Sequence, residues 1–306
     1  MNNSEILFLY DAKMTNPNGN VDDENRPRMD YESKRNLVSD VRLKRYIRDY
    51  LELQGKSLYV GKVDGKTVNA EKRLEPLLAE LPGKVDKKTW NAEHEAWLLD
   101  QLIDVRLFGA TMPVKGMPLT FTGPVQFSWG YSLNPVTIME STITTHFSST
   151  GEQSQGTMGR DYRVVYSFLS FYGLISGKRA QWTRLTEEDV QLLDEAMVRS
   201  IPLLATRSKI GQSPRLYMRV EYVDDLTLIG DWRDKLDPLG DSLNQINDVE
   251  LNAERLITKL EQVKDKIHRI HLWEDTDLKV SSQGAAGAFS ELLPSALQTK
   301  LHHIDG

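Results

Sequence analysis

The pattern of apolar and polar positions predicts a chain that alternates strands and helices. A short apolar run at residues 5–10 is typical of a buried strand, and residues 39–51 place apolar side chains at helical spacing after an N-cap at Ser39 or Asp40. Residues 186–189 (Thr-Glu-Glu-Asp) form a capping box before a helix that ends near residue 205. Composition and spacing predict further strands at residues 121–133, 142–147, 163–175 and 216–223, and further helices at residues 90–105 and 249–270.

The order of these elements indicates a fold. Once residues 52–105 are set aside as a helical insertion with its own small core, the order is strand, helix, strand, strand, helix, strand. This is the split βαβ arrangement of ferredoxin-like and RNA-recognition folds, so the predicted class is α+β. The sheet face of such a fold, flanked by basic loops, is a common platform for single-stranded RNA. Residues 148–159 contain almost nothing to bury, which predicts a long mobile loop or a protruding hairpin.

Composition favours a soluble protein, which we expect in the cytoplasm. Of the 306 residues, 40% are hydrophobic and 27% are charged, which excludes disordered, collagenous and membrane-spanning classes. The first residues lack the basic start and apolar stretch of a signal peptide. Because the chain has no cysteine, disulfides, thiolate zinc sites and iron–sulfur clusters are excluded. We expect no cofactor.

Net charge changes the picture only when its distribution is considered. The formal charge of −6 argues on average against a nucleic-acid binder. Residues 26–48, however, hold eight basic and three acidic side chains, a net +5, whereas residues 221–261 carry a net −7. On the predicted helix 39–51 the arc opposite the apolar face carries Arg42, Lys44, Arg45 and Arg48. Four like charges on one face repel one another unless phosphates neutralise them, which favours a polyanion-binding face over an ordinary solvated one.

Two further clusters of basic residues favour nucleic-acid binding over catalysis. A second basic loop spans residues 207–215, and basic residues flank the polar segment 148–159, where apolar side chains could enter between bases. The side chains concerned are Arg207 and Lys209 in the loop, Arg160 and Arg163 beside the segment, and the apolar Phe147 and Met158.

The case for catalysis is weaker. Asp11, Asp22, Asp23 and Glu24 follow the first strand, where paired carboxylates could bind a metal ion. Acidic residues around an Asn-Pro-Asn-Gly turn are more often solvated or cap backbone amides. The sequence has no Walker loop, no dinucleotide fingerprint and no defensible Ser-His-Asp spacing, so we expect no enzyme.

Several of these residues belong to motifs of a known family. In chain order the motifs are residues 16–19 (Asn-Pro-Asn-Gly), 26–28 (Arg-Pro-Arg), 41–48 (Val-Arg-Leu-Lys-Arg-Tyr-Ile-Arg), 104–109 (Asp-Val-Arg-Leu-Phe-Gly), 122–128 (Thr-Gly-Pro-Val-Gln-Phe-Ser), 156–160 (Gly-Thr-Met-Gly-Arg) and 205–209 (Ala-Thr-Arg-Ser-Lys). Together they resemble the backbone subunit of type I CRISPR Cascade complexes, within the RAMP superfamily, most closely type I-B and then type I-C. The resemblance covers residues 5–225.

The resemblance implies a hand-shaped protein that polymerises along one CRISPR RNA. Residues 1–51 and 106–225 would form a modified RNA-recognition palm, residues 52–105 a helical insertion, residues 144–162 a thumb hairpin that displaces a guide base, and residues 226–306 a C-terminal helical extension packed on the palm. The phosphate-gripping helix falls on Lys44, Arg45 and Arg48, and Thr111 and Met112 would press against guide bases. The complete expected RNA-binding set is Asn18, Arg26, Arg28, Arg42, Lys44, Arg45, Arg48, Thr111, Met112, Phe147, Met158, Arg160, Arg163, Arg207 and Lys209.

The resemblance also implies a non-catalytic subunit with several partners. These are CRISPR RNA, target DNA, further copies of the chain, the 5′-handle-binding, large and guide-processing subunits of Cascade, and a recruited nuclease-helicase or transposition adaptor. Related type III backbones cleave target RNA with a loop aspartate, so a metal-dependent endoribonuclease using Asp11 or Asp22 and Asp23 is the alternative. A basic-faced scaffold without nucleic acid is a third hypothesis, and antiviral defence and guided transposition stay equally open.

Overall fold

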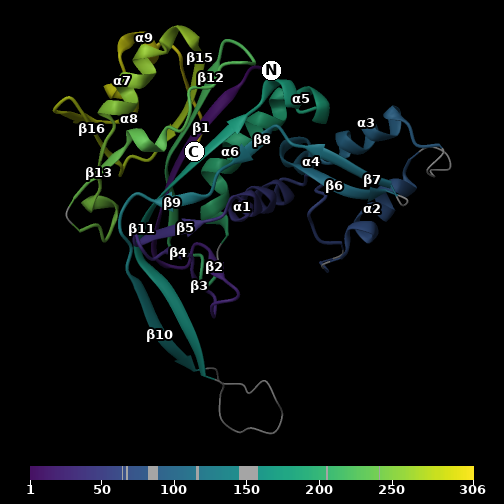
Figure 1. Ribbon diagram of the computed structural model, residues 1–306, viewed down its shortest axis with the longest axis horizontal. Coiled ribbons are helices and arrows are strands. Elements are labelled where there is room, and N and C mark those ends of the chain that lie inside the picture. Colours follow the sequence, from purple (N-terminus) through teal and green to yellow (C-terminus); the bar gives the residue numbers. More distant parts are fainter. Residues whose placement is uncertain are drawn as a thin grey trace.

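A long sheet, antiparallel except for the parallel pair at one edge, runs through the middle of the molecule (Figure 1). The computed structural model describes residues 1–63, 65–66, 68–81, 89–114, 117–144, 158–204, 206–240 and 242–306. Within these residues the sheet consists, from one edge to the other, of β18 (Leu301–His303), β15 (Ile267–Glu274), β12 (Gln212–Tyr222), β1 (Ser4–Thr15), β11 (Met158–Ile175), β9 (Gly130–Ser132), β5 (Arg35–Val38) and β4 (Met29–Asp30). Two more strands, β8 (Val125–Phe127) and β10 (Ile138–Thr144), pair with β11.

The centre of this sheet has the predicted ferredoxin-like connectivity. Strand β1 lies antiparallel between β11 and β12, and helices α1 (Asp40–Leu53) and α6 (Glu187–Leu203) connect the strands. Both helices begin where the sequence indicates, because the Ser39 hydroxyl caps α1 and Thr186 and Asp189 form the capping box of α6. The α+β class is therefore confirmed.

Both faces of the central sheet are covered by other parts of the chain, so neither face is an open platform for RNA. Along β1, Ile6 and Phe8 face the core formed with α1 and α6, whereas Leu7 and Leu9 face a second core formed with the C-terminal residues. Trp232 is fully buried in the second core. A strand covered on both sides needs a continuous apolar run, which is what residues 5–10 provide.

The C-terminal residues form a mixed α and β layer and not the expected helical extension. The helix predicted at residues 249–270 is confined to α7 (Glu254–Gln262), and β15 follows it and pairs with the edge of β12. Unpaired N–H and C=O groups at the β12 edge favour a further strand over a longer helix. The other elements here are β13 (Asp237–Leu239), β14 (Glu250–Asn252), β16 (Lys279–Ser282), β17 (Ala285–Gly287), α8 (Phe289–Leu292) and α9 (Ser295–Gln298).

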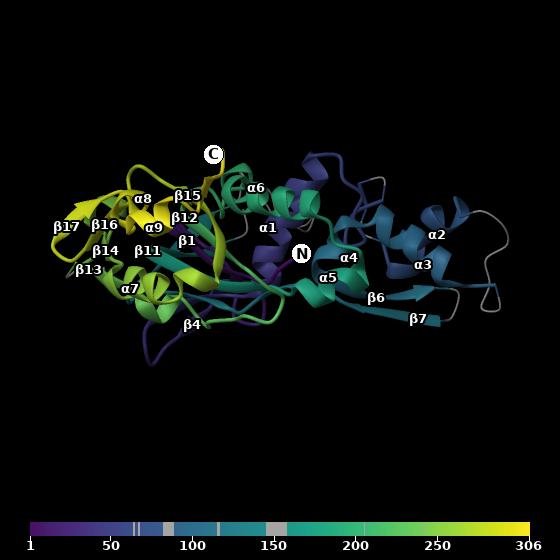
Figure 2. The same ribbon diagram turned by 90° about the horizontal axis from the view of Figure 1, so that it is seen from above.

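Two parts of the chain project from the sheet in different directions (Figures 1 and 2). The insertion has its own core around Leu74, Leu98 and Leu102. It extends past the predicted end at residue 105, and it contains α2 (Ala70–Ala79), α3 (Ala92–Gln101), α4 (Ile103–Phe108), and the hairpin of β6 (Gly109–Val114) and β7 (Met117–Thr122), with α5 (Gly177–Thr183) beside it. The second projection is the hairpin of β10 and the first half of β11. The predicted thumb, residues 144–162, overlaps the ends of these strands, and its residues 145–157 lie outside the described part of the chain. No helix among the described residues is long and apolar enough to span a membrane.

Candidate nucleic-acid interface

The loop after β1 is fixed to the start of helix α1 by an asparagine. Asn18 Oδ1 accepts hydrogen bonds from the backbone N–H (2.9 Å) and the hydroxyl (3.0 Å) of Ser39. The Asn18 carbonyl accepts another from the backbone N–H of Arg28 (3.0 Å), and the Ser39 hydroxyl accepts one from the backbone N–H of Arg42 (3.3 Å). These contacts bring two predicted RNA-binding arginines to the same end of the helix.

Arg42 lies at this helix end, and within the described part of the chain two nitrogens of its guanidinium group lack a hydrogen-bond partner. Its guanidinium carbon is 4.2 Å from the centroid of the Tyr46 ring. Its Nε and Nη2 atoms are buried, and no described residue accepts a hydrogen bond from them. A buried donor without a partner costs about 1–3 kcal/mol. Native proteins usually satisfy such groups with protein atoms, water or a bound ligand.

A second cation reaches the same place from the loop between α6 and β12. The Lys209 ammonium donates hydrogen bonds to the backbone carbonyls of Asn16 and Pro17, the latter at 3.1 Å. Burial and, to a smaller extent, the positive charge of Arg42 lower the pKa of Lys209 to about 7. Among the described residues neither cation forms an ion pair with a carboxylate. The two side chains therefore repel each other with no anion between them.

We call the start of α1 at Ser39, together with Arg28, Arg42 and Lys209, the basic helix end. The first N–H groups of a helix carry a partial positive charge, which adds to the charge of the three side chains. An anion with several acceptor oxygens would satisfy the unpaired donors and remove the repulsion. A phosphate has both properties, so the basic helix end can bind phosphate.

The remaining basic residues of α1 are paired with carboxylates of the same chain, which contradicts the expected uniform basic face. Lys44 is only 8% exposed and contacts Asp40 and Gln126, each at 3.2 Å. Arg48 donates from Nε to Asp104 at 3.0 Å, and the Asp104 side chain is 1% exposed. Arg45 pairs with Asp49 at 2.7 Å on the surface. Lys44 and Arg48 are therefore anchors between α1 and its neighbours, and their expected phosphate contacts lack an accessible charge.

Sequence reasoning missed Asp104, which organises this part of the molecule. Its carboxylate accepts hydrogen bonds from the backbone N–H groups of Tyr59 (2.7 Å) and Val60 (3.0 Å) as well as from Arg48. It thereby attaches the insertion to helix α1. The available signal is an acidic residue within residues 102–108, a run whose only other charged residue is Arg106, because a carboxylate at such a position requires buried donors.

The predicted cations at the base of the hairpin belong to a mixed-charge network. The Arg26 guanidinium lies 4.4 Å from the centroid of the Tyr162 ring, and Arg160 pairs with Glu24 (3.3 Å) and Glu140 (3.7 Å). The hydrogen bond from the Tyr162 hydroxyl and the charge of Arg160 lower the pKa of Glu24. This network connects the loop after β1 to β10 and β11. Arg160 is more than half exposed and keeps a surface that a ligand can reach.

Asp161 joins the other two predicted cations of this region. It pairs with Arg163 at 2.8 Å and with Arg207 at 3.1 Å. Arg163 also donates to the Met14 carbonyl at 2.8 Å, so its role is largely structural. The side chain of Arg207 is 62% exposed and remains accessible.

The predicted base-contacting residues have different outcomes. Thr111 is exposed on β6, with its hydroxyl 3.3 Å from that of Thr120. Met112 is fully buried in the core of the insertion, so its expected contact with guide bases is wrong. The two residues alternate on one strand, and the insertion core takes the apolar side chain. Phe147 lies outside the described residues, and for Met158 only the backbone position at the start of β11 is described.

The carboxylates proposed for metal chemistry do not come together. Asp11 is 4% exposed and accepts hydrogen bonds from Arg215 (3.0 Å) and the Tyr166 hydroxyl (3.1 Å). Burial raises the pKa of Asp11, although both partners favour its charged form. Asp22 is exposed, and Asp23 lies 3.9 Å from Arg26. Among the residues that the structure describes, no group of three or more His, Asp or Glu side chains could hold a metal ion.

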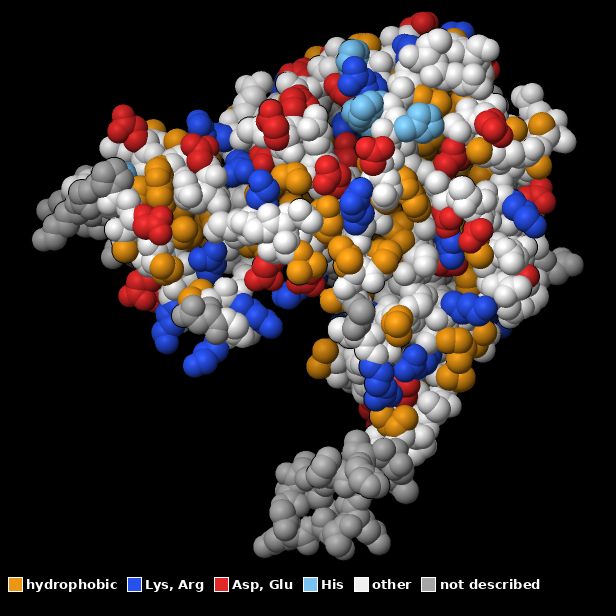
Figure 3. All heavy atoms as spheres, turned by 180° about the vertical axis from the view of Figure 1, so that it is seen from behind, with side chains coloured by type: hydrophobic (Ala, Val, Ile, Leu, Met, Phe, Trp, Pro, Cys, Tyr) orange, Lys and Arg blue, Asp and Glu red, His pale blue; other side chains and the backbone are white. Residues whose placement is uncertain are grey.

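The space-filling view shows how charge is distributed over one face of the molecule (Figure 3). The outline is indented between the insertion and the hairpin, and Lys and Arg side chains lie on both sides of this indentation. Elsewhere on the same face acidic and basic side chains are mixed. Cations on both sides of an indentation are the expected arrangement for a groove that follows a nucleic-acid backbone.

Comparison with known proteins gives a consistent family assignment. The family model described as CRISPR-associated protein Cas7 matches residues 2–278. A curated protein of that description from Haloferax volcanii is 36% identical over 304 residues, covering 92% of this chain and 89% of its own length. A subunit of a solved CRISPR RNA-guided surveillance complex in a pre-nicking state has the same fold, with a TM-score of 0.57, 12% identity, and coverage of 92% of this chain and 96% of its own.

Proposed function

Since the chain belongs to the CRISPR-associated Cas7 family, we propose that it is the RNA-binding backbone subunit of a CRISPR surveillance complex. Several copies would bind side by side along one CRISPR RNA, and the basic helix end of each copy would hold a phosphate of the RNA backbone. The observation that carries this proposal is the pair Arg42 and Lys209, two neighbouring cations without a carboxylate partner among the described residues.

The charges of Arg42 and Lys209 favour RNA as the ligand over a partner protein that carries no phosphate. Hydrogen bonds from a charged donor contribute about 1.5–3 kcal/mol, more than bonds between neutral groups. A phosphate at the basic helix end would gain such bonds from Arg42 and would also return Lys209 to its charged form. The exposed cations Arg160 and Arg207 at the hairpin base would continue the contact along the RNA backbone.

The subtype of the complex, its partners and its place in the cell are also part of the proposal. The motif resemblance supports a type I-B complex that recognises target DNA, with the 5′-handle-binding, large and guide-processing subunits as partners. The projecting hairpin would act as a thumb on the guide, and destruction of the target would fall to a recruited nuclease-helicase. The protein would act in the cytoplasm. No described residue distinguishes antiviral defence from guided transposition, so the proposal includes both uses.

We propose that the subunit does not cleave RNA itself. The alternative, a metal-dependent endoribonuclease, needs carboxylates that can bind a metal ion together. Asp11 already accepts hydrogen bonds from Arg215 and Tyr166, and the Asp23 carboxylate lies 3.9 Å from Arg26. To test this, the purified protein is incubated with single-stranded RNA and Mg²⁺, and we expect full-length RNA. Cleavage that Asp22→Asn or Asp23→Asn abolishes would establish the alternative.

The main experiment is to purify the protein from its host and sequence the nucleic acid that remains bound. We expect repeat-spacer RNA with the wild-type protein and its loss in the double variant Arg42→Gln, Lys209→Gln. The matched control is Arg45→Gln, which removes a cation of the same helix that already has a carboxylate partner. Circular dichroism and thermal unfolding check that the variants fold. Wild-type protein without RNA, or unchanged RNA in the double variant, would overturn the proposal.

A further inference from the structure

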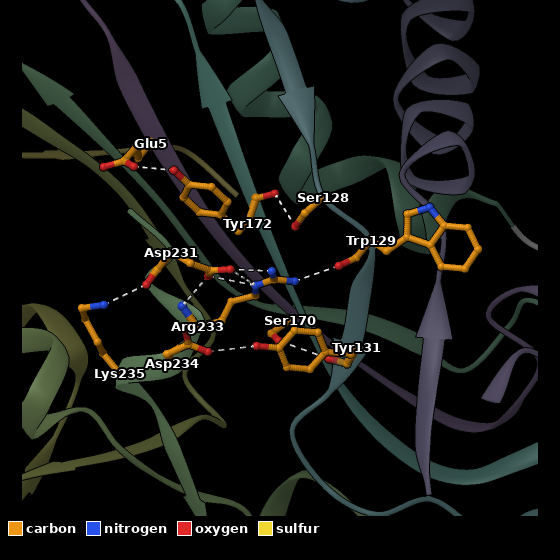
Figure 4. Close-up of polar contacts among 10 residues, drawn as sticks. All are labelled: Glu5, Ser128, Trp129, Tyr131, Ser170, Tyr172, Asp231, Arg233, Asp234 and Lys235. Carbon is orange, nitrogen blue, oxygen red and sulfur yellow. Dashed lines mark hydrogen bonds and ion pairs between the residues drawn. The ribbon is translucent and has the colours of Figure 1, made fainter. Parts of the chain in front are cut away.

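Trp129 is a large aromatic side chain that the fold leaves unusually open. It lies in the two-residue gap between β8 and β9, and 48% of its surface is exposed. Figure 4 shows its indole ring turned away from the polar contacts that surround its backbone. The alternation of apolar residues along the predicted strand 121–133 puts Trp129 on the same side as Phe127 and Tyr131, so the sequence pattern gives it no separate role.

The backbone around Trp129 is fixed by hydrogen bonds, although about half of the residue is exposed. The Trp129 carbonyl accepts a hydrogen bond from Arg233 Nη1 at 2.7 Å, and the Ser128 hydroxyl donates to the Tyr172 carbonyl at 3.2 Å (Figure 4). The Ser128 backbone N–H donates to the same carbonyl at 2.9 Å. Arg233 is itself fixed by Asp231 and stacks 4.4 Å from the Tyr131 ring. At Gly130 an added Cβ would lie 2.3 Å from the Phe171 ring, so the chain can pass here only without a side chain. A rigid support of this kind lowers the entropy lost when a ligand covers the indole.

An arginine of the basic helix end lies next to this ring. The Arg28 guanidinium carbon is 6.0 Å from the indole centroid, its Nε is buried, and no described residue accepts a hydrogen bond from its guanidinium group. The backbone of Arg28 is bonded to Asn18, which caps the start of α1 through Ser39. The aromatic surface therefore continues the basic helix end.

We propose that the indole of Trp129 stacks on a base of the single-stranded RNA whose phosphate occupies the basic helix end. This inference rests on the proposed function and names a contact of that same site. A strand with a phosphate near Arg42 and a neighbouring phosphate near Arg28 brings its bases over the exposed ring. Stacking needs no particular base, which suits a subunit that must bind guides of any sequence.

The surroundings favour a nucleobase over a protein side chain as the occupant. Trp182 is more exposed than Trp129, at 70%, but no arginine or lysine lies over its ring among the described residues. An exposed tryptophan beside an unpaired arginine combines the two elements of single-strand binding, an aromatic platform and a phosphate contact. Trp182 therefore serves as the matched control, because it has the aromatic surface without the cation.

The test measures binding of two probes to the full-length protein at constant salt. One probe is a short single-stranded RNA, and the other is a ribose-phosphate strand of the same length without bases. We expect Trp129→Ala to weaken binding of the RNA by about 5- to 150-fold. Binding of the abasic strand should stay within about twofold, because the phosphate contacts remain. Trp129→Phe should retain most of the affinity for RNA, and Trp182→Ala should leave the binding of both probes unchanged.

The outcomes separate this inference from the function on which it rests. If Trp129→Ala weakens both probes equally, or neither, base stacking at Trp129 is wrong while RNA binding by the wild type stands. A Trp129→Ala variant that binds RNA normally but has a changed oligomeric state by light scattering would identify a protein contact and overturn the inference. Wild-type protein that binds neither probe would overturn the proposed function, and the inference with it.

Discussion

Arg42 and Arg48 belong to the same helix and the same charge run, but the structure surrounds them differently. Arg48 and its neighbour Lys44 are largely buried and paired with Asp104 and Asp40. Arg42 lies close to a second cation, and its buried nitrogens have no partner among the described residues. One end of the basic face is therefore complete without a ligand, and the other end is not. Unsatisfied charge points to a ligand more reliably than the number of charges does.

The largest expected effect comes from a substitution that breaks the buried ion pair between Arg48 and Asp104. Asp104→Ala leaves Arg48 buried without a counter-charge and removes the acceptor for the backbone N–H groups of Tyr59 and Val60. Removing one partner of a buried pair typically costs about 3–5 kcal/mol. We expect a loss of this size in the free energy of unfolding, measured by urea denaturation. A loss below about 1 kcal/mol would mean that the ion pair is not structural.

This expectation replaces one that the sequence suggests. From the helix alone, Lys44→Glu with Arg48→Glu should abolish RNA retention without unfolding the protein. In the structure Arg48→Glu would place a second carboxylate next to Asp104. The two negative charges would repel each other, so the variant should lose stability, and a loss of RNA retention could not be assigned to a lost RNA contact.

The second largest effect should follow from Arg42→Gln at the incomplete end. We expect RNA affinity to fall about 10- to 100-fold, the equivalent of one charge-assisted hydrogen bond. Stability should change little, because no carboxylate loses its partner. The slope of log affinity against log salt should decrease in size by about 0.7, the value for one phosphate contact on a single strand. An unchanged slope would show that Arg42 does not contact a phosphate.

A smaller effect should appear as a dependence of RNA binding on pH. The pKa of Lys209 is lowered to about 7, so above that pH the free protein has a largely neutral Lys209. A phosphate beside it favours the charged form, and RNA binding then takes up a proton. Affinity should rise as pH falls from about 9 to about 7, by at most about tenfold per pH unit, and level off below. Lys209→Arg, which stays charged throughout, should remove this dependence in a titration of RNA binding.

The smallest effect is expected at the surface pair of the same helix. Arg45 and Asp49 are 2.7 Å apart, but the Arg45 side chain is nearly half exposed. Asp49→Ala should change the free energy of unfolding by less than about 0.5 kcal/mol and leave RNA affinity within about twofold. A large loss of RNA affinity in Arg45→Gln, in contrast, would move the phosphate contact away from Arg42.

The elements nearest the site were predictable where local chemistry decides them. Ser39 caps α1 and Thr186 caps α6 because their hydroxyls bond to backbone N–H groups a few residues along the chain. Met112 was misassigned because its neighbour Thr111 faces outward on the same strand and nothing local distinguishes an inner from an outer position. The helix expected through residue 270 ends earlier because the edge of β12 recruits residues 267–274. Such pairing partners lie too far away in the chain to be read from a local pattern.

The sequence by itself determined the α+β class, the order of the central strands and helices, and the segments that contain the cations. Helix caps, apolar periodicity and charge runs depend on residues a few positions apart, so they can be read directly. Only the tertiary structure decided which cations are free. Asp104 reaches Arg48 across 56 positions, whereas no described carboxylate reaches Arg42 or Lys209. Electrostatic pairing depends on distance in space, and the fold alone sets that distance.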